Sequence, residues 1–246
     1  MGNLTGKVAL VTGGGRGIGP VIALRLAEDG ATVIVNYAHS RAGAEKVVNA
    51  IASKGGTAIA IQADIRQRAE IVQMFQQIDR NPGRIDIVVN CAGLGNPTPL
   101  LGEIDEEAVE TMLGVNLRGP LYITTEAAKR MPSGGRVVNF STSVKKFPFP
   151  GTSVYAGAKA AVETFTEVWA KELGAKGITV NTVIPGATSP GMMDNSPGHR
   201  EFFEKSSPFG RIGRAEEVAA VVAFLCSPEA SWVSGTHILV NGAANT

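Results

Sequence analysis

The sequence has little cysteine, little net charge and no long apolar run. Its two cysteines, Cys91 and Cys226, are too few for a disulfide framework, which favours a reducing compartment such as the cytoplasm. The 23 basic residues nearly balance the 22 acidic ones and form no block that would neutralise the phosphates of a nucleic acid. No apolar stretch is long enough to span a bilayer, and no signal peptide is recognisable. We therefore expect a cytoplasmic protein whose partners include neither nucleic acid nor a membrane.

Hydrophobic residues make up 44% of the chain and charged residues 18%, a balance typical of a globular protein. Short runs rich in Val and Ile recur at steady intervals, and segments with helical spacing separate them. Strands so continuous in apolar residues are usually buried on both faces, as in a parallel sheet. The sequence therefore predicts one α/β domain over residues 1–246, a Rossmann-like doubly wound parallel sheet of about seven strands with helices on both faces. The expected strands span residues 8–11, 32–35, 58–61, 85–89, 136–140, 178–184 and 237–240.

A glycine-rich turn follows the first expected strand, where residues 12–19 read Thr-Gly-Gly-Gly-Arg-Gly-Ile-Gly. The spacing beyond it predicts a helix over 18–29, with Pro20 in the first turn, where a missing N–H costs little. Such glycines let the backbone approach a pyrophosphate, which the helix N-terminus attracts. The alternative is a glycine-rich loop that binds nothing. The candidate cofactor-binding residues of this turn are Gly13, Gly15, Arg16, Gly17, Ile18 and Gly19.

The end of the second expected strand indicates which dinucleotide is bound. A site for NAD usually places Asp or Glu there to hold the adenosine ribose, but the first acidic residue after this strand is Glu45. Arg16 and Arg41, with Ser40 and Asn36, would instead bind a 2′-phosphate, so we expect NADP(H) to be preferred over NAD(H). The alternative is that both arginines are simply solvated. The candidates at this strand end are Asn36, Tyr37, Ser40 and Arg41.

Two further strand ends carry candidate cofactor contacts, because ligands of such sheets lie outside the carboxyl ends of the strands. Asp64, followed by Ile65, is placed to meet the adenine edge, or else it caps the next helix. Small residues after the fourth strand would let the cofactor pass, and we expect Cys91 among them to be a buried residue rather than a nucleophile. The candidates at that strand end are Asn90, Ala92 and Gly93.

Tyr155 and Lys159 lie four residues apart in an expected helix over 154–174, so they share one helix face. A free phenol has a pKa of about 10, too high for a good base near neutrality. The Lys159 cation, with the nicotinamide charge, would favour the phenolate. The alternative is an ordinary surface pair. With a dinucleotide site in the same chain, the pair indicates hydride transfer to a carbonyl or from an alcohol.

The ordered motifs resemble the classical short-chain dehydrogenase/reductase family over essentially the whole chain, close to the branch of 3-oxoacyl-carrier-protein reductases and sugar dehydrogenases. The resemblance implies that Tyr155 is the general acid in reduction and the base in oxidation, and that Lys159 also holds the nicotinamide ribose. It implies that Asn116 anchors a water-linked proton path; the compatible alternative is a residue that satisfies backbone groups at a helix kink. It further implies a homotetramer formed through helices near 105–131 and 154–174. The motifs, with further expected cofactor contacts, are residues 12–19, 90–93, Asn116, 155–159, Pro185, Gly186 and Thr188.

One position departs from the resemblance. The family has a serine thirteen residues before the tyrosine, where it orients the substrate carbonyl, and this chain has Thr142 there. Threonine keeps the hydroxyl donor and adds a methyl group. Either Thr142 does the work of the serine, or the strand end shifts so that Ser143 does. The intact register favours Thr142.

Residues 188–208 form the least regular stretch, with several prolines and adjacent apolar pairs. A long irregular loop in a compact α/β domain is usually functional, so we expect a substrate lid there, the alternative being a surface loop. Apolar residues in this stretch, after the fourth strand and before Tyr155 predict an apolar or mixed pocket, unless they pack in the core. The substrate candidates are Leu94, Gly95, Phe147, Phe149, Met192, Met193 and Phe202.

Together these patterns predict an oxidoreductase that transfers a hydride between NADP(H) and a small-molecule carbonyl or secondary alcohol, with Tyr155 as general acid or base. No set of metal ligands is expected. The alternative is a catalytically silent dinucleotide-binding sensor or scaffold, and only the altered Thr142 encourages it.

Overall fold

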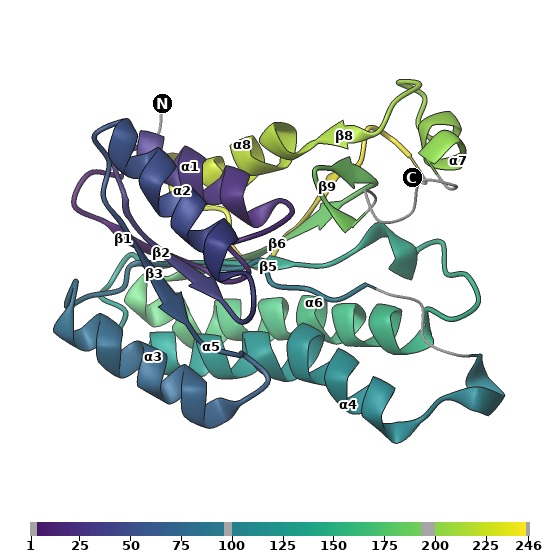
Figure 1. The fold of residues 1–246 in the computed structure, drawn as a ribbon, viewed down its shortest axis with the longest axis horizontal. Helices are drawn as coiled ribbons and strands as arrows, with labels where there is room; N and C mark the ends of the chain where they lie inside the picture. The colour runs from purple at the N-terminus through teal and green to yellow at the C-terminus, as the bar shows by residue number, and fades with distance from the viewer. Residues whose placement is uncertain (1–3, 96–99, 193–199, 245–246) are drawn as a thin grey trace.

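A seven-stranded parallel sheet forms the centre of the molecule, in the order β3-β2-β1-β4-β5-β6-β9 (Figure 1). The structure, a computed structural model, describes residues 4–95, 100–192 and 200–244. The predicted doubly wound sheet of seven strands is confirmed. Its strands are β1 (Val8–Val11), β2 (Thr32–Tyr37), β3 (Ala58–Gln62), β4 (Ile87–Asn90), β5 (Arg136–Phe140), β6 (Thr179–Pro185) and β9 (His237–Val240).

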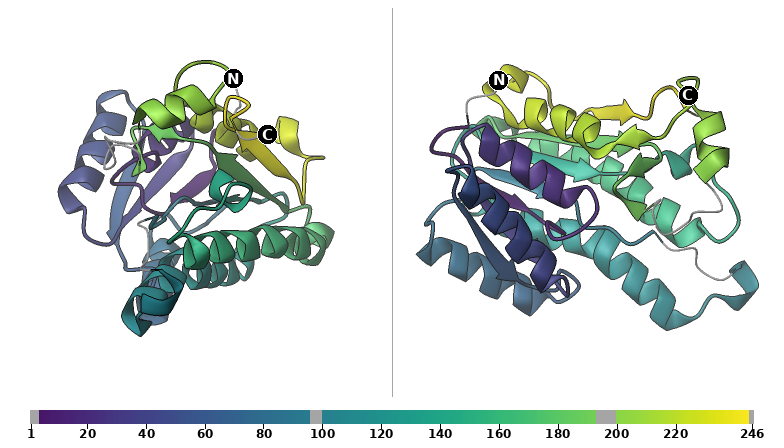
Figure 2. Two further views of the ribbon diagram at one scale, coloured as in Figure 1. Left: turned by 90° about the vertical axis from the view of Figure 1, so that its right-hand side faces the viewer. Right: turned by 45° about the horizontal axis from the view of Figure 1, so that its top comes forward.

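Helices cover both faces of the sheet (Figures 1 and 2). One layer consists of α1 (Gly19–Glu28), α2 (Arg41–Ser53) and α8 (Ala215–Cys226). The opposite layer consists of α3 (Arg68–Arg80), α4 (Glu106–Leu113), α5 (Gly119–Ala128) and α6 (Ser153–Leu173). Among the helices of the described ranges, none combines the length and the apolar character needed to cross a membrane.

The two faces of the sheet contribute to two separate cores, because successive strand residues point to opposite sides. In β1, Ala9 and Val11 pack toward α1, α2 and α8, whereas Val8 and Leu10 pack toward α3 and α5. All four residues of β1 are therefore buried. This two-sided cover explains why the strands read as continuous apolar runs without polar alternation.

The segment 188–208 is more regular than the sequence analysis predicted. Strand β7 (Thr188–Ser189) pairs with β8 (Gly213–Arg214), and helix α7 spans Arg200–Ser206. Ion pairs between residues four apart join Arg200 to Glu204 and Glu201 to Lys205, and such pairs stabilise a short helix. The expectation of a wholly irregular stretch was therefore wrong, although residues 193–199 lie outside the described part of the chain.

Candidate active site

The glycine turn between β1 and α1 forms a tight cradle at the point where the strand order reverses. A Cβ on Gly13, where φ is +66°, would lie 2.9 Å from the Cα of Ala92. A Cβ on Gly19 would lie 2.3 Å from the carbonyl oxygen of Gly13. Pro20 lies in the first turn of α1 as predicted, and Ile18 is the residue that precedes the helix. Only a chain without side chains at these positions can fold this closely, so the turn fits the pyrophosphate of a dinucleotide.

The ends of β1 and β4 are tied together beside this cradle. The Thr12 hydroxyl accepts a hydrogen bond from the Ala92 amide at 3.1 Å, and the Thr12 amide donates to the Val89 carbonyl. The Asn90 amide donates to Thr124 and to Asn139, so it fixes the end of β4 from inside the sheet. These bonds fix the ends of β1 and β4 relative to each other beside the glycine turn.

Of the four residues predicted to bind a 2′-phosphate, two are engaged inside the protein. The buried Asn36 amide donates to the Ala63 carbonyl at 3.0 Å, and the Ser40 hydroxyl donates to the Gly15 carbonyl at 3.2 Å. Arg16 is exposed at the turn. Arg41 pairs with Glu45 at 2.8 Å, yet its side chain is 75% exposed. The two arginines are therefore the groups available to a phosphate. Tyr37, the last residue of β2, is buried.

Asp64 lies after β3 and is held by its neighbour Arg66. Its carboxylate accepts the Arg66 backbone amide at 2.9 Å and also pairs with the guanidinium. Partial burial opposes ionisation of Asp64, but the bonds from Arg66 outweigh it and hold the pKa below its ordinary value. Helix α3 is preceded by Gln67, so Asp64 is not its N-cap. Ile65 is buried against Gly119 at the start of α5.

Tyr155 and Lys159 lie one turn apart on α6, and both are buried. The Lys159 ammonium donates to the Phe140 carbonyl at 2.9 Å. Burial lowers the pKa of Lys159 to about 8, and burial raises the pKa of Tyr155 above its ordinary value. The sequence predicts that Lys159, with the nicotinamide charge, favours the phenolate. In this structure, desolvation of the phenol outweighs the opposing effect of Thr142, so the pKa of Tyr155 is raised.

Thr142 is the hydroxyl that meets Tyr155. The Thr142 hydroxyl lies close enough to the phenol to oppose the effect of burial on the Tyr155 pKa. Thr142 follows β5, is buried, and accepts the Val144 amide at 3.3 Å at the start of a one-turn helix over Ser143–Lys145. Ser143 is half-buried in that turn.

Asn116 is fully buried in a π-helical turn, Gly114–Arg118, that joins α4 to α5. Its amide donates to the Leu94 carbonyl at 2.8 Å and to the Met112 carbonyl at 3.0 Å, and its oxygen accepts the Leu94 amide. The wider turn frees backbone groups that the side chain then satisfies. Asn116 therefore holds the chain just after β4, next to Gly93.

The segment after β6 crosses the cofactor cradle and reaches Tyr155. Pro185 ends β6, the Gly186 amide donates to Val240, and the Thr188 hydroxyl donates to the Gly186 carbonyl. A Cβ on Gly17 would lie 3.7 Å from the Cα of Gly191. A Cβ on Gly95 would lie 2.4 Å from the Met192 sulfur and 3.7 Å from the ring carbon of Tyr155 that bears the hydroxyl. Met192 therefore lies beside the end of β4, close to the same glycine as the Tyr155 ring.

The other substrate candidates lie mostly at the surface. Phe147, Phe149 and Phe202 are 45%, 46% and 65% exposed, so the alternative that they pack in the core is wrong. Leu94 is half-buried, and Met193 lies outside the described residues. Burial raises the pKa of the Cys91 thiol to about 12, which suits the expected inert residue.

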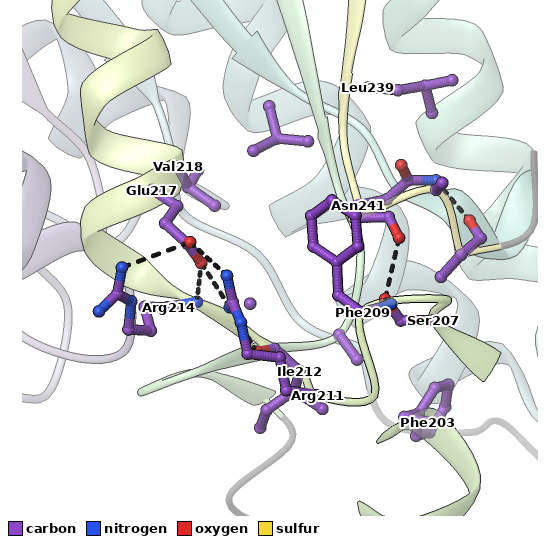
Figure 3. Close-up of a pocket in the computed structure, with 16 residues that line it drawn as sticks. Phe203, Ser207, Phe209, Arg211, Ile212, Arg214, Glu217, Val218, Leu239 and Asn241 are labelled. Atoms are coloured by element: carbon purple, nitrogen blue, oxygen red, sulfur yellow. Dashed lines mark hydrogen bonds and ion pairs between the residues drawn. The ribbon is translucent and has the colours of Figure 1, made fainter. Parts of the chain in front are cut away.

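The structure also shows two features that the sequence analysis missed. A buried carboxylate, Glu163, lies one turn after Lys159 and contacts Ser141. A separate cavity of about 300 Å³ lies between α8, the segment 207–214 and residues 239–244. Glu217 binds both Arg211 and Arg214 along its wall (Figure 3). In the described ranges, no cluster of three or more His, Cys, Asp or Glu is arranged to hold a metal ion.

Comparison with known proteins places this geometry in a family. A family model described as "Enoyl-(Acyl carrier protein) reductase" matches residues 13–245. The short-chain dehydrogenase/reductase AacuN of Aspergillus aculeatus is 40% identical, over 98% of this chain and 96% of the relative. The hydroxynaphthalene reductase-like protein Arp2 of Metarhizium robertsii is 39% identical, over 99% of this chain and 97% of the relative. The solved structure of the angucycline C-6 ketoreductase LanV with bound NADP has a TM-score of 0.93 and 35% identity, with coverage of 99% and 97%. The chain belongs to the short-chain dehydrogenase/reductase family and is an oxidoreductase.

Proposed function

We propose that this protein uses NADPH to reduce a ketone to a secondary alcohol, with Tyr155 as the general acid. The observation that carries the proposal is the buried Tyr155 phenol, with the buried Thr142 hydroxyl beside it and the buried Lys159 one helical turn away. A proton donor, a hydroxyl that can orient a carbonyl and a cation meet at one end of the sheet, next to a cradle that fits a pyrophosphate.

Each side chain has a separate task in the proposed reaction. Thr142 donates a hydrogen bond to the carbonyl oxygen and holds it against the phenol. Tyr155 transfers its proton to that oxygen as negative charge develops on it. Lys159 holds the ribose beside the nicotinamide and favours the phenolate that remains. Asn116 orders the backbone at Leu94, where a water-linked path can return the proton.

The cradle at residues 13–19 would hold the pyrophosphate, and Asp64, Asn90 and Thr188 lie on the strand ends that border it. The bound dinucleotide supplies the hydride. The raised pKa of Tyr155 keeps the phenol protonated at neutral pH, which suits an acid in the direction of reduction. We therefore propose reduction as the working direction.

We propose NADP(H) rather than NAD(H) because Arg16 and Arg41 are exposed cations beside the end of β2, and no carboxylate lies between that strand and Glu45. Arginine binds a 2′-phosphate through charge-assisted hydrogen bonds. The ion pair of Arg41 with Glu45 is exposed and contributes little, so a phosphate can replace it. The NADP held by LanV supports the same choice.

The substrate is, in this proposal, a ketone on a fused aromatic ring system. The exposed Phe147, Phe149 and Phe202 and the thioether of Met192 lie on the segments around the cleft, where flat apolar rings could pack against them. The names of Arp2 and LanV describe reductases of hydroxynaphthalene and angucycline compounds. The segment 188–208 would act as the lid over such a substrate.

We also propose a homotetramer in the cytoplasm. Helix α6 leaves Val168 46% exposed beyond the face that packs on the sheet, as expected if a second copy covers it. Gel filtration with light scattering should give four chains per particle, and a monomer would remove this part of the proposal.

The test is a set of initial rates with NADPH and NADH across tetralones, quinones, sugars and an acyl thioester. We expect NADPH oxidation with the bicyclic ketones and a lower rate with NADH. Tight NADPH binding without turnover on any substrate would instead favour the silent sensor or scaffold.

A further inference from the structure

A buried carboxylate lies on the catalytic helix where the proposed reaction does not need one. Glu163 follows Lys159 by one turn of α6 and is 5% exposed. One of its oxygens accepts the Ser141 hydroxyl at 2.5 Å, and the other is paired with the Lys145 ammonium. A buried carboxylate is costly unless a cation and hydrogen bonds satisfy it. Both partners come from the same short segment after β5.

That segment is the one that carries Thr142. The Lys159 ammonium binds the Phe140 carbonyl just before it, and the Ser141 hydroxyl also approaches the Lys159 carbonyl at 3.4 Å. Lys145 is three residues beyond Thr142, at the end of the one-turn helix that Thr142 begins. Thr142 is therefore fastened to α6 on both sides, and two of the fastenings end on Glu163.

We propose that Glu163, with Lys145 and Ser141, is a positioning device that holds the end of β5 so that the Thr142 hydroxyl faces Tyr155. This inference rests on the proposed function of the site. The side-chain partners of Glu163 are Ser141 and Lys145, so it would act on Thr142 through the Ser141–Lys145 segment. Lys145, three residues after Thr142, thereby pairs with Glu163 inside the protein and does not bind a substrate.

The device has a consequence for proton transfer. Burial raises the pKa of Tyr155, and the Thr142 hydroxyl beside it lowers that pKa. Among the described residues, the titratable groups on the elements that carry Tyr155 and Thr142 or border them are Lys159 on the same helix, Cys91 at the end of β4, and the Glu163–Lys145 pair behind Thr142. Loss of the device should weaken the interaction of the Thr142 hydroxyl with Tyr155 and raise the Tyr155 pKa. The pH dependence of kcat should then shift to higher pH.

The variants separate the charge pair from the fold. Glu163→Gln keeps an acceptor for Ser141 but removes the ion pair, and Lys145→Met removes the cation from the other side. Lys145→Arg restores the charge. Glu167→Gln is the matched control, because Glu167 lies one turn further along α6 and its side chain is 57% exposed beside His237.

We expect Glu163→Gln and Lys145→Met to lower kcat for ketone reduction about tenfold, which is a typical coupling between contacting groups. The Kd for NADPH, read from nucleotide fluorescence, should not change. The pH profile of kcat should move upward in both variants, while Lys145→Arg and Glu167→Gln should behave as the unsubstituted protein does.

The decisive comparison repeats Glu163→Gln in a Thr142→Ala background. If Glu163 acts through Thr142, the second change should lower the residual kcat by less than about twofold. A full tenfold loss in that background, or unaltered turnover and pH profile in both single variants, would overturn the inference. If Glu163→Gln does not fold, Lys145→Met carries the same comparison. An unsubstituted protein that binds NADPH but reduces no ketone overturns the proposed function and this inference together, whereas active protein without coupling overturns only the inference.

Discussion

The two sides of the proposed site differ in the atoms that form them. Backbone atoms of the glycine turn form the cofactor side, and exposed side chains form the substrate side. On the cofactor side, Gly13 and Gly19 bring backbone atoms into contact. The turn is held by the bond that the Thr12 hydroxyl accepts from the Ala92 amide and by the bond that the Ser40 hydroxyl donates to Gly15. On the substrate side, exposed side chains such as Phe147 and Phe202 surround the opening. A site made of backbone cannot change without loss of the fold, whereas exposed side chains can change freely. In the proposed function, the cofactor side would set the class of reaction and the substrate side would select the compound.

The sharpest way to separate the two sides is to remove the proton donor between them. Tyr155→Phe keeps the ring and its packing but deletes the hydroxyl, so we expect kcat to fall about a thousandfold or more, because general acid catalysis is lost. NADPH binding should stay within about threefold of the unsubstituted protein, since the cradle is unaltered. Stopped-flow rates and nucleotide fluorescence measure the two effects. Parallel losses in both would contradict a division between the sides.

The buried Lys159 ammonium lies between the two sides, and its burial should lower the free energy of unfolding. Its pKa falls to about 8 in the folded protein from 10.5 in the unfolded chain. Between these values the unfolded state binds more protons, so this group makes stability rise with pH over that window. Below pH 8 the full penalty remains, on the order of 3 kcal/mol. Urea unfolding of the native and Lys159→Met proteins at pH 7 to 10.5 should show the rise only in the native protein. Parallel curves would contradict the buried, shifted lysine.

The next test concerns the Thr142 hydroxyl, which would orient the substrate carbonyl. Thr142→Val removes the hydroxyl without a change of shape, and we expect kcat to fall about a hundredfold, as for the loss of one donor to a developing oxyanion. Thr142→Ser should stay active, and Ser143→Ala should change kcat by less than about threefold. Full activity in Thr142→Val together with loss in Ser143→Ala would give the role to Ser143.

A single methyl group on the cofactor side should act on binding. Gly19→Ala places a Cβ 2.3 Å from the Gly13 carbonyl oxygen, so the turn must open. We expect the Kd for NADPH to rise by about tenfold to a hundredfold, in line with an overpacking cost of roughly 1–3 kcal/mol. Gly157→Ala is the control, because a Cβ there meets nothing within 4 Å. Equal behaviour of the two variants would show that the cradle is not tightly packed.

The smallest expected effect lies on the substrate side. Gly95→Ala places a Cβ 2.4 Å from the Met192 sulfur, so it should displace Met192 and raise KM for a bulky ketone about fivefold. Met192→Ala should remove the clash, and the double variant should recover the lost affinity. Steady-state KM values for a bulky and a small ketone measure this coupling. Additive effects of the two substitutions would mean that Met192 does not face Gly95 when substrate is bound.

The sequence was sufficient for features that depend on neighbours in the chain. The strands follow from Val and Ile runs that two helical layers bury, and Tyr155 and Lys159 share a face because of helical spacing. Helix α7 could have been predicted from its pairs of charges four residues apart. Contacts between distant segments carry no such signal. The hydrogen bond from the Asn36 side chain to the Ala63 carbonyl and the ion pair between Glu163 and Lys145 form only when the chain has folded.

Hydride transfer can be measured directly with NADPH that carries deuterium at both hydrogen positions of the nicotinamide C4, so that the label is transferred from either face of the ring. The protein is incubated with a tetralone, and the alcohol is analysed by mass spectrometry. The account predicts one deuterium at the carbinol carbon of the product from the unsubstituted protein, and no product above background from Tyr155→Phe protein that still binds NADPH. An alcohol without deuterium, or equal product from both proteins, would contradict it.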